Sequence, residues 1–310
     1  MTTSFVLHGG NTPFFAAWGT GRYQKEGLDV TIQRGHGSKA TISTVFSGKS
    51  HFGEAGVGTA IISRSQNANV KEIGMIYHND QSAVITLKGS GIRTPADFKG
   101  RRLGVVAASS TRTIFPAVLR RNGLKESDVT FVTMTPAALS SSLLAGQVDM
   151  FLTFAVTAVP LSFQAKAMGR EVVLIPYGEH GVSLYGNGII TSDALIEKNP
   201  DVVRRFVKAT LEAAVWAVEH PVEAANFLLK FQPSVTPESA LEQWKTTIRF
   251  VVIPESLKTG LGYMERDKMA FTQEVIEEFM KDKLGPVKVK AQDVYTNRFI
   301  PGKLVPKSAR

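Results

Sequence analysis

The chain of 310 residues contains no cysteine. This absence excludes disulfides, thiolate metal sites, iron–sulfur clusters and cysteine nucleophiles. It does not fix the compartment, because a chain without cysteine suits the periplasm and is tolerated in the cytoplasm.

Long apolar runs are also missing. The most apolar stretches, such as 155–161, are far shorter than the ~18 residues that cross a bilayer, so we expect no membrane span. The N-terminal residues Met1 to Phe5 place no basic region before an apolar core, so no signal peptide is recognised. Either the protein is cytoplasmic or a signal peptide has been removed.

Runs of like charge do not occur, although the formal net charge is +9. The densest basic clusters are the pairs 101–102, 120–121 and 204–205. Scattered charge of this kind does not indicate a nucleic-acid surface, and we expect no nucleic-acid partner. The composition, 43% apolar and 20% charged, is that of a globular chain of about two domains.

The common catalytic motifs are absent as well. There is no Gly-x-Ser-x-Gly elbow or His-Glu-x-x-His motif, and the six histidines have no metal-ligand spacing. The turn 56–59 lacks the third glycine of a dinucleotide fingerprint and the Gly-Lys-Ser/Thr of a P-loop. We therefore expect no metal, no cofactor and no enzymatic activity.

What the chain does contain is a pattern that occurs twice. Apolar segments typical of strands alternate with helical segments, and glycines end the helices at Gly27 and Gly48 and again at Gly123 and Gly146. The predicted strands are 5–7, 29–33, 102–107, 129–133 and 149–153, and the predicted helices are 13–24, 38–46, 112–121 and 135–144. Such alternation predicts two similar lobes, each with a mostly parallel sheet.

Two further apolar strands, 83–87 and 188–191, flank the second lobe, and each is a candidate to carry the chain across. We predict a discontinuous first lobe, residues 1–86 plus 189–310, and a second lobe, residues 87–188. Two crossings form a hinge, which predicts a cleft that closes on a ligand. The hydrophobic periodicity of the last third of the chain predicts amphipathic helices over 193–220, 222–231, 237–250 and 266–283. We expect these helices to pack back onto lobe one, with Trp216 and Trp244 in the core.

Ligands of parallel sheets bind beyond the carboxyl ends of the strands, so the candidate residues lie in the loops after strands. Ser109, Ser110 and Thr111 open a helix whose N-terminus attracts negative charge, and Arg112 offers a fork for carboxylate, sulfonate or phosphate. An ordinary helix cap with a solvated arginine is the alternative.

In lobe one, Gly37 and Ser38 open a helix where glycine allows close approach of a ligand, and His36 is a candidate hydrogen-bond donor. A plain tight turn is the alternative there. The remaining candidates combine polar loop residues with aromatic side chains that either stack on a planar ligand or belong to the core: Asn11, Thr12, Phe14, Trp18, Gly58, Thr59, Asp80, Thr135, Phe154, Tyr185 and Asn187. For Asp80 a turn role is the alternative.

Several motifs resemble a known family. They are Phe-Phe-Ala-Ala at 14–17, Tyr-Gln-Lys-Glu-Gly-Leu-Asp-Val at 23–30, Gly-Ile-Arg-Thr-Pro-Ala-Asp-Phe-Lys-Gly-Arg-Arg at 91–102, Leu-Ala-Gly-Gln-Val-Asp at 144–149 and Asn-Pro-Asp-Val-Val-Arg-Arg-Phe at 199–206. Together they resemble the nitrate/sulfonate/taurine and thiamine-pyrimidine-precursor group of ABC-transporter substrate-binding proteins.

The resemblance implies an α/β, two-lobed type II periplasmic-binding-protein fold with a C-terminal helical extension. It also implies a monomeric periplasmic receptor that passes a small molecule to a membrane permease. Where many relatives have a Trp-Glu-Pro-like segment, this chain has Phe154-Ala155-Val156 without an acid. We therefore favour a planar or aromatic ligand with an anionic or polar group. The alternative is a cytoplasmic enzyme on the same scaffold acting on a pyrimidine or aromatic sulfur compound, although the cysteines of the known enzyme branches are absent.

Overall fold

The structure, a computed structural model, describes residues 1–4, 7–107 and 109–307, which form two compact units. Unit 1 comprises Met1–Asn79, Leu184–Glu274 and Asp282–Arg310, and unit 2 comprises Asp80–Ser183 and Val275–Lys281. The predicted boundaries between the lobes follow residues 86 and 188, whereas the observed boundaries between the units follow Asn79 and Ser183, a few residues earlier. The short segment 275–281 also groups with unit 2, although we had placed it in lobe one.

Unit 1 contains a three-stranded sheet in the order β1-β8-β2, made of β1 (Gly53–Gly56), β8 (Asn187–Ser192) and β2 (Val70–Met75). Both strand pairs are antiparallel, so the prediction of a mostly parallel sheet is wrong for this lobe. The reason is that β8 enters from a distant part of the chain and runs between β1 and β2 in the opposite direction.

Two predicted strands of unit 1 need separate mention. The segment 29–33 contributes only an isolated bridge between Thr2 and Gln33, so the predicted strand there is wrong. Residues 5 and 6 of the first predicted strand lie outside the described residues, and Leu7 is not in a strand.

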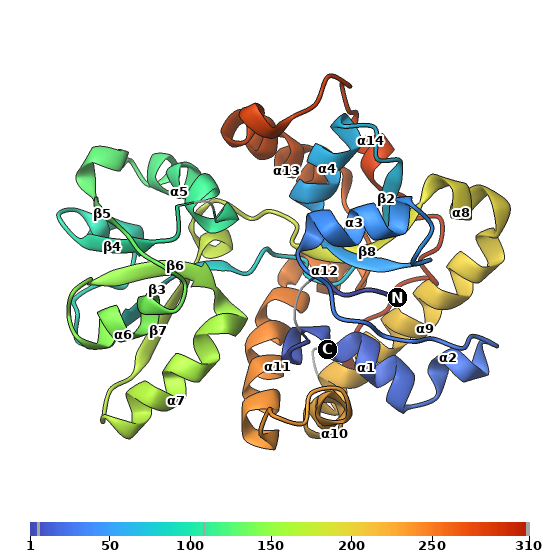
Figure 1. Cartoon of the computed structure of the whole chain (residues 1–310), viewed down its shortest axis with the longest axis horizontal. Helices are drawn as coiled ribbons and strands as arrows, with labels where there is room; N and C mark the ends of the chain where they lie inside the picture. The colour runs from blue at the N-terminus through green and yellow to red at the C-terminus, as the bar shows by residue number, and fades with distance from the viewer. Residues whose placement is uncertain (5–6, 108, 308–310) are drawn as a thin grey trace. The chain divides into compact units, whose positions relative to one another are not determined.

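In unit 1 far more residues lie in helices than in strands (Figure 1). They are α1 (Thr12–Gly19), α2 (Arg22–Lys25), α3 (Ser38–Phe46), α4 (Val57–Ser65), α8 (Asp193–Lys198), α9 (Pro200–Glu219), α10 (Pro221–Asn226), α11 (Pro237–Val251), α12 (Pro254–Thr259), α14 (Ala291–Val294) and most of α13 (Arg266–Phe279). The predicted helix 13–24 is divided into α1 and α2 at Gly21, whose φ of +69° belongs to the left-handed region.

The core of unit 1 lies between the N-terminal helices and the C-terminal third of the chain. Phe14 and Phe15 of α1 are 0% exposed, and α9 lies along α1 (Figure 1). The ring of Phe206 on α9 stacks on Phe52 with centroids 3.9 Å apart. Trp244 is fully buried and donates its indole N–H to the Ala217 carbonyl at 2.8 Å. Helices of the C-terminal third thus pack on the N-terminal helices with Trp244 in the core, whereas Trp216, which we also expected there, is only partly buried against it.

Unit 2 contains a five-stranded sheet in the order β5-β4-β6-β3-β7. Its strands are β3 (Ser82–Leu87), β4 (Arg102–Val105), β5 (Thr130–Thr133), β6 (Met150–Phe154) and β7 (Val172–Pro176). The pairs of β4 with β5 and β6 are parallel, whereas β3 is antiparallel to both of its neighbours. The helices are α5 (Ser110–Arg121), α6 (Ala138–Leu144) and α7 (Val159–Ala167).

The two strands expected to cross between lobes do not cross. The strand at 83–87 is β3 in the sheet of unit 2, and the strand at 188–191 is β8 in the sheet of unit 1. The chain changes unit just before each of them, at the peptide bonds that follow Asn79 and Ser183.

The repeated glycines end equivalent helices in the two units. Gly48 follows α3 with a φ of +76°, and Gly146 follows α6 with a φ of +70°. Both adopt the left-handed conformation that ends a helix at little cost only in glycine. The glycine spacing in the sequence thus reports a helix-ending turn that occurs in both units.

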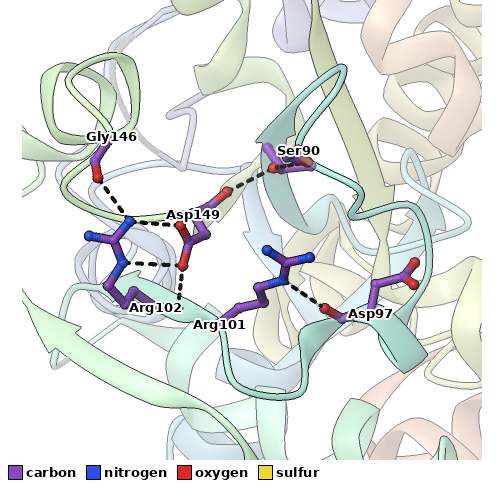
Figure 2. A network of polar contacts seen from close by, with 7 residues as sticks. Ser90, Asp97, Arg101, Arg102, Gly146 and Asp149 are labelled. Atoms are coloured by element: carbon purple, nitrogen blue, oxygen red, sulfur yellow. Dashed lines mark hydrogen bonds and ion pairs between the residues drawn. The ribbon is translucent and has the colours of Figure 1, made fainter.

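The motif around Asp149 fastens β4 to the turn before β6 (Figure 2). Its carboxylate accepts the backbone N–H of Arg102 at 2.8 Å and a guanidinium N–H of Arg102 at 2.7 Å. The same guanidinium donates to the Gly146 carbonyl at 2.8 Å, and Thr86 on β3 donates its hydroxyl to the Asp149 carbonyl at 2.8 Å. This family-like motif therefore has a structural role in unit 2.

Replacing Asp149 by Asn should destabilise the protein by about 1–2 kcal/mol at pH 7, because a charge-assisted, paired contact with Arg102 is lost at a partly exposed site. Arg102 holds the pKa of Asp149 below its ordinary value of 3.8. The stabilisation is therefore present above pH 3.8 and is lost as pH falls through the lower pKa of the folded state. Urea unfolding of Asp149→Asn, with the exposed Asp29→Asn as control, should show a difference at pH 7 that shrinks toward pH 3. An equal difference at both pH values would contradict this role.

Candidate functional site

Two helix N-termini in unit 1 begin at glycines that offer no side chain as a cap. Gly37 precedes α3, Gly56 precedes α4, and neither helix has a side-chain cap. The N–H of Gly56 donates to the hydroxyl of Ser38 at 3.2 Å, which brings the two helix starts together. The Val57 N–H at the start of α4 donates to the Gly186 carbonyl at 3.0 Å, and the positive ends of the two helices favour a negatively polarised group.

The Cα of Gly56 presents a bare face surrounded by side-chain oxygens. A Cβ atom placed there would lie 3.2 Å from Asn187 Oδ1, 3.8 Å from Ser38 Oγ and 3.9 Å from Thr59 Oγ1. The φ of −74° and ψ of 136° suit any residue, so the backbone conformation does not require glycine. We call Ser38, Gly56, Gly58, Thr59 and Asn187, all half-buried, the Gly56 floor.

The floor unites residues that the sequence placed in separate loops. Ser38, Gly58, Thr59 and Asn187 were candidates, and the structure brings them together on unit 1. Gly37 adjoins them as the residue before α3, and its N–H donates to the Ser4 carbonyl at 2.7 Å.

A buried carboxylate that the sequence did not reveal lies behind this floor. Glu54 on β1 is 0% exposed, and its oxygens accept hydrogen bonds from Asn11 Nδ2 at 2.7 Å and Asn187 Nδ2 at 3.1 Å. The backbone N–H and the hydroxyl of Ser4 each donate to it at 3.2 Å. Burial raises the pKa of Glu54, whereas the bonds from Asn187 and Ser4 oppose that rise. Asn11, a predicted ligand contact, is 0% exposed and donates its side-chain N–H to this carboxylate.

A second carboxyl group, that of Glu72 on β2, is also 0% exposed. Neither of its oxygens has a hydrogen-bond partner among the described residues. Gly188 leaves room for it, because a Cβ there would lie 2.3 Å from Glu72 Oε2. Burial and the nearby charge of Glu54 raise the pKa of Glu72 well above its ordinary value. Because Glu54 receives four donated bonds and Glu72 none, Glu54 is the member of the pair whose charged form is better stabilised.

Four other predicted contacts of unit 1 lie in packed surroundings. Phe14 and Thr12 are 0% exposed, and Trp18 packs edge-on against Phe231 with ring centroids 5.0 Å apart. Tyr185 is buried, accepts the Glu265 N–H on its hydroxyl at 2.7 Å and carries the Lys268 ammonium over its ring. The structure does not bring these four side chains to the Gly56 floor. His36 is exposed in the turn before α3.

In unit 2 the predicted anion site at α5 is partly satisfied by its own residues. Ser109 is the N-cap and accepts the Arg112 N–H on its hydroxyl at 3.2 Å. The same hydroxyl lies 3.0 Å from that of Thr111, whose side chain is buried. Ser110 is half-exposed in the first turn. Ala108, which belongs to the predicted loop 107–111, lies outside the described residues.

The Arg112 side chain has partners within unit 2. Its guanidinium pairs with Glu126 at 2.5 Å and lies 4.1 Å from the centroid of the Phe131 ring. These contacts do not favour the predicted anion fork.

The last predicted contacts of unit 2 differ in exposure. Asp80 accepts the Ser82 N–H at 2.9 Å, as in a turn, and burial raises its pKa. Thr135 and Phe154 are exposed. For all of these residues, contact with a ligand stays a prediction.

Replacing Glu72 by Gln should make the protein less sensitive to rising pH. A raised carboxyl pKa means that the folded state holds a proton that the unfolded state releases above about pH 4.5, so the wild type loses stability as pH rises from there to the pKa of folded Glu72. For each pH unit in that window, the free energy of unfolding of Glu72→Gln should rise by about 1.4 kcal/mol relative to that of the wild type. Denaturant unfolding from pH 4.5 to 8 measures this gain, with the exposed Glu197→Gln as control. Parallel pH profiles for wild type and Glu72→Gln would refute it.

Comparison with known proteins gives relatives along most of the chain. A riboflavin-binding protein, RibY of Chloroflexus aurantiacus, is 26% identical over 97% of this chain and 86% of its own length. The 4-amino-5-hydroxymethyl-2-methylpyrimidine phosphate synthase of Schizosaccharomyces pombe is 23% identical over 75% of this chain and 69% of its own length.

The fold is also found among solved structures. The periplasmic aliphatic sulphonate binding protein SsuA from Escherichia coli superposes with a TM-score of 0.75 over 98% of this chain and 94% of that one, at 17% identity. This likeness confirms the predicted periplasmic-binding-protein fold. Residues 10–224, more than half of the chain, match the family described as NMT1/THI5 like. The chain therefore belongs to the NMT1/THI5-like family, the group that its sequence motifs resemble.

Proposed function

We propose that this protein is the solute-binding receptor of an ABC importer and that it captures a small planar or aromatic organic molecule bearing an anionic or polar group. The observation that carries the proposal is the Gly56 floor, where two helix N-termini without side-chain caps meet beside a bare glycine face. Backbone N–H groups that no side chain caps are suited to the oxygens of a carboxylate, sulfonate or ring carbonyl.

The ligand class rests on the relatives and on one aromatic residue. RibY is named for riboflavin, the yeast synthase for a pyrimidine and SsuA for aliphatic sulphonates. Of the three aromatic side chains predicted to stack on a ligand, Phe14 is in the core and Trp18 packs on Phe231, whereas Phe154 is 37% exposed. Phe154 is thus the residue of the three that we propose for stacking.

The permease partner and the periplasmic location belong to the same proposal. They are supported by the likeness to a periplasmic sulphonate-binding protein. Within residues 1–4, 7–107 and 109–307, no helix has both the length and the apolar character needed to span a bilayer.

A cytoplasmic enzyme on this scaffold is the second candidate, and the yeast synthase is the relative that favours it. The two candidates differ in turnover. A receptor returns its ligand unchanged, so mass spectrometry after prolonged incubation with any bound compound should recover that compound alone. A new product would favour the enzyme.

A thermal-shift screen tests the receptor directly. The panel is riboflavin, 4-amino-5-hydroxymethyl-2-methylpyrimidine, benzoate, benzenesulfonate and ethanesulfonate. A ligand at a hundred times its Kd stabilises the folded state by about 2.7 kcal/mol, which gives a clear rise in Tm. At least one compound should do so, and a panel without any stabilising compound would count against the proposed ligand class.

Replacing Ser38 by Ala tests the floor as the place of binding. The variant should weaken the best panel compound about tenfold in calorimetric titration, because one hydrogen bond to the ligand or to Gly56 is lost. Ser43→Ala, an exposed serine on the same helix, is the matched control and should bind as the wild type does. Unchanged affinity in Ser38→Ala would place the ligand elsewhere.

A further inference from the structure

The side-chain amide of Asn187 is held with its NH2 group turned inward. Nδ2 donates to Ser4 Oγ at 3.0 Å and to Glu54 Oε1 at 3.1 Å, so both amide protons have partners. Ser4 Oγ in turn donates to Glu54 Oε2 at 3.2 Å. Asn187 and Ser4 therefore both direct their protons toward the buried carboxylate.

This arrangement leaves the amide one orientation. Rotating the amide by half a turn would set Asn187 Oδ1 against the Glu54 carboxylate and would remove two donated bonds in a buried site, where unmet polar groups are costly. The neighbouring Glu72 carboxyl receives no donated bond, so the donors around the pair converge on Glu54.

The opposite end of the amide is its oxygen, and it faces the bare side of Gly56. Asn187 Oδ1 is the nearest side-chain atom to a Cβ built at Gly56, at 3.2 Å. Ser38 Oγ and Thr59 Oγ1 border the same space, and a hydroxyl either donates or accepts. An amide oxygen only accepts, so Asn187 is the member of the floor that discriminates between ligand groups.

We infer that Glu54 orients Asn187 so that its Oδ1 accepts a hydrogen bond from an N–H group of the ligand above Gly56, which restricts the ligand to molecules with a ring N–H or an amine at that end. The inference rests on the proposed function and deepens it. The uncapped helix N-termini at the same floor accommodate a neighbouring carbonyl or anionic oxygen, so the preferred group presents a donor beside an acceptor, as an imide or an aminopyrimidine does.

Matched heterocycles that differ in one N–H test this inference. The probes are lumiflavin against its N3-methyl derivative and 1-methyluracil against 1,3-dimethyluracil. For whichever of the two pairs binds the wild type, the compound with the N–H should have a Kd at least about tenfold lower than its methylated partner. The reason is that methylation removes the hydrogen bond and leaves Oδ1 buried without a partner. In Asn187→Ala this ratio should fall to within about twofold, whereas the exposed Asn226→Ala should keep it.

Glu54→Gln separates orientation from steric fit. A Gln side chain can pair with the Asn187 amide in either of its two orientations, and it leaves the volume near Gly56 unchanged. The ratio of affinities for the N–H and N-methyl probes should therefore fall at least threefold. A steric effect of the methyl group would leave the preference intact in this variant. Circular dichroism and Tm establish that each variant is folded, and Asn187→Ala supplies the test if Glu54→Gln does not fold.

The outcomes separate the inference from the proposed function. Binding of a heterocycle with equal affinity for both members of its pair overturns the inference and leaves the receptor standing. A best panel ligand without any N–H, such as ethanesulfonate, does the same. If neither the probes nor any panel compound binds, the proposed function fails and the inference fails with it.

Discussion

The carboxylate of Glu54 determines the orientation of the polar side chains around the sheet of unit 1. It is buried on a short strand and would be costly without partners, so it must be surrounded by donors. The chain supplies them from three distant places: Ser4 near the N-terminus, Asn11 before α1 and Asn187 at the start of β8. The three segments are thereby fixed relative to β1, and the Gly56 floor is formed beside them.

The two units use charge in different ways. In unit 1 the carboxylate is buried and its partners are neutral amides, a hydroxyl and a backbone N–H, so they satisfy it without adding a positive charge. In unit 2 the Asp149 carboxylate is partly exposed and pairs with Arg102, which fastens strands to a turn (Figure 2). The first arrangement orients the polar side chains of the Gly56 floor, and the second stabilises the scaffold of unit 2.

The sequence predicted well those features that depend on neighbours along the chain. The amphipathic C-terminal helices and the helix-ending glycines, such as Gly48 and Gly146, follow local rules and were found. The strand order of unit 1 was not found, because β8 pairs with strands more than a hundred residues earlier. The contacts of Trp18 with Phe231 and of Arg112 with Glu126 were not foreseen, because these partners lie outside any local pattern. Glu54 was missed because a single acid in a short strand is indistinguishable from a solvent-facing one until the fold surrounds it.

Gly188 on β8 lies directly against the side chain of Glu72 on β2, although the two residues are far apart in the chain. The space that it leaves on β8 is filled by the Glu72 carboxyl, and even a methyl group there would collide with that carboxyl. A Cβ at 188 would also lie 2.9 Å from the Gly74 carbonyl oxygen, a backbone atom on the neighbouring strand, so a shorter residue at 72 alone would not make room for alanine at 188. Position 188 is therefore restricted to glycine by the close pairing of β8 with β2 as well as by the acid that lies against it.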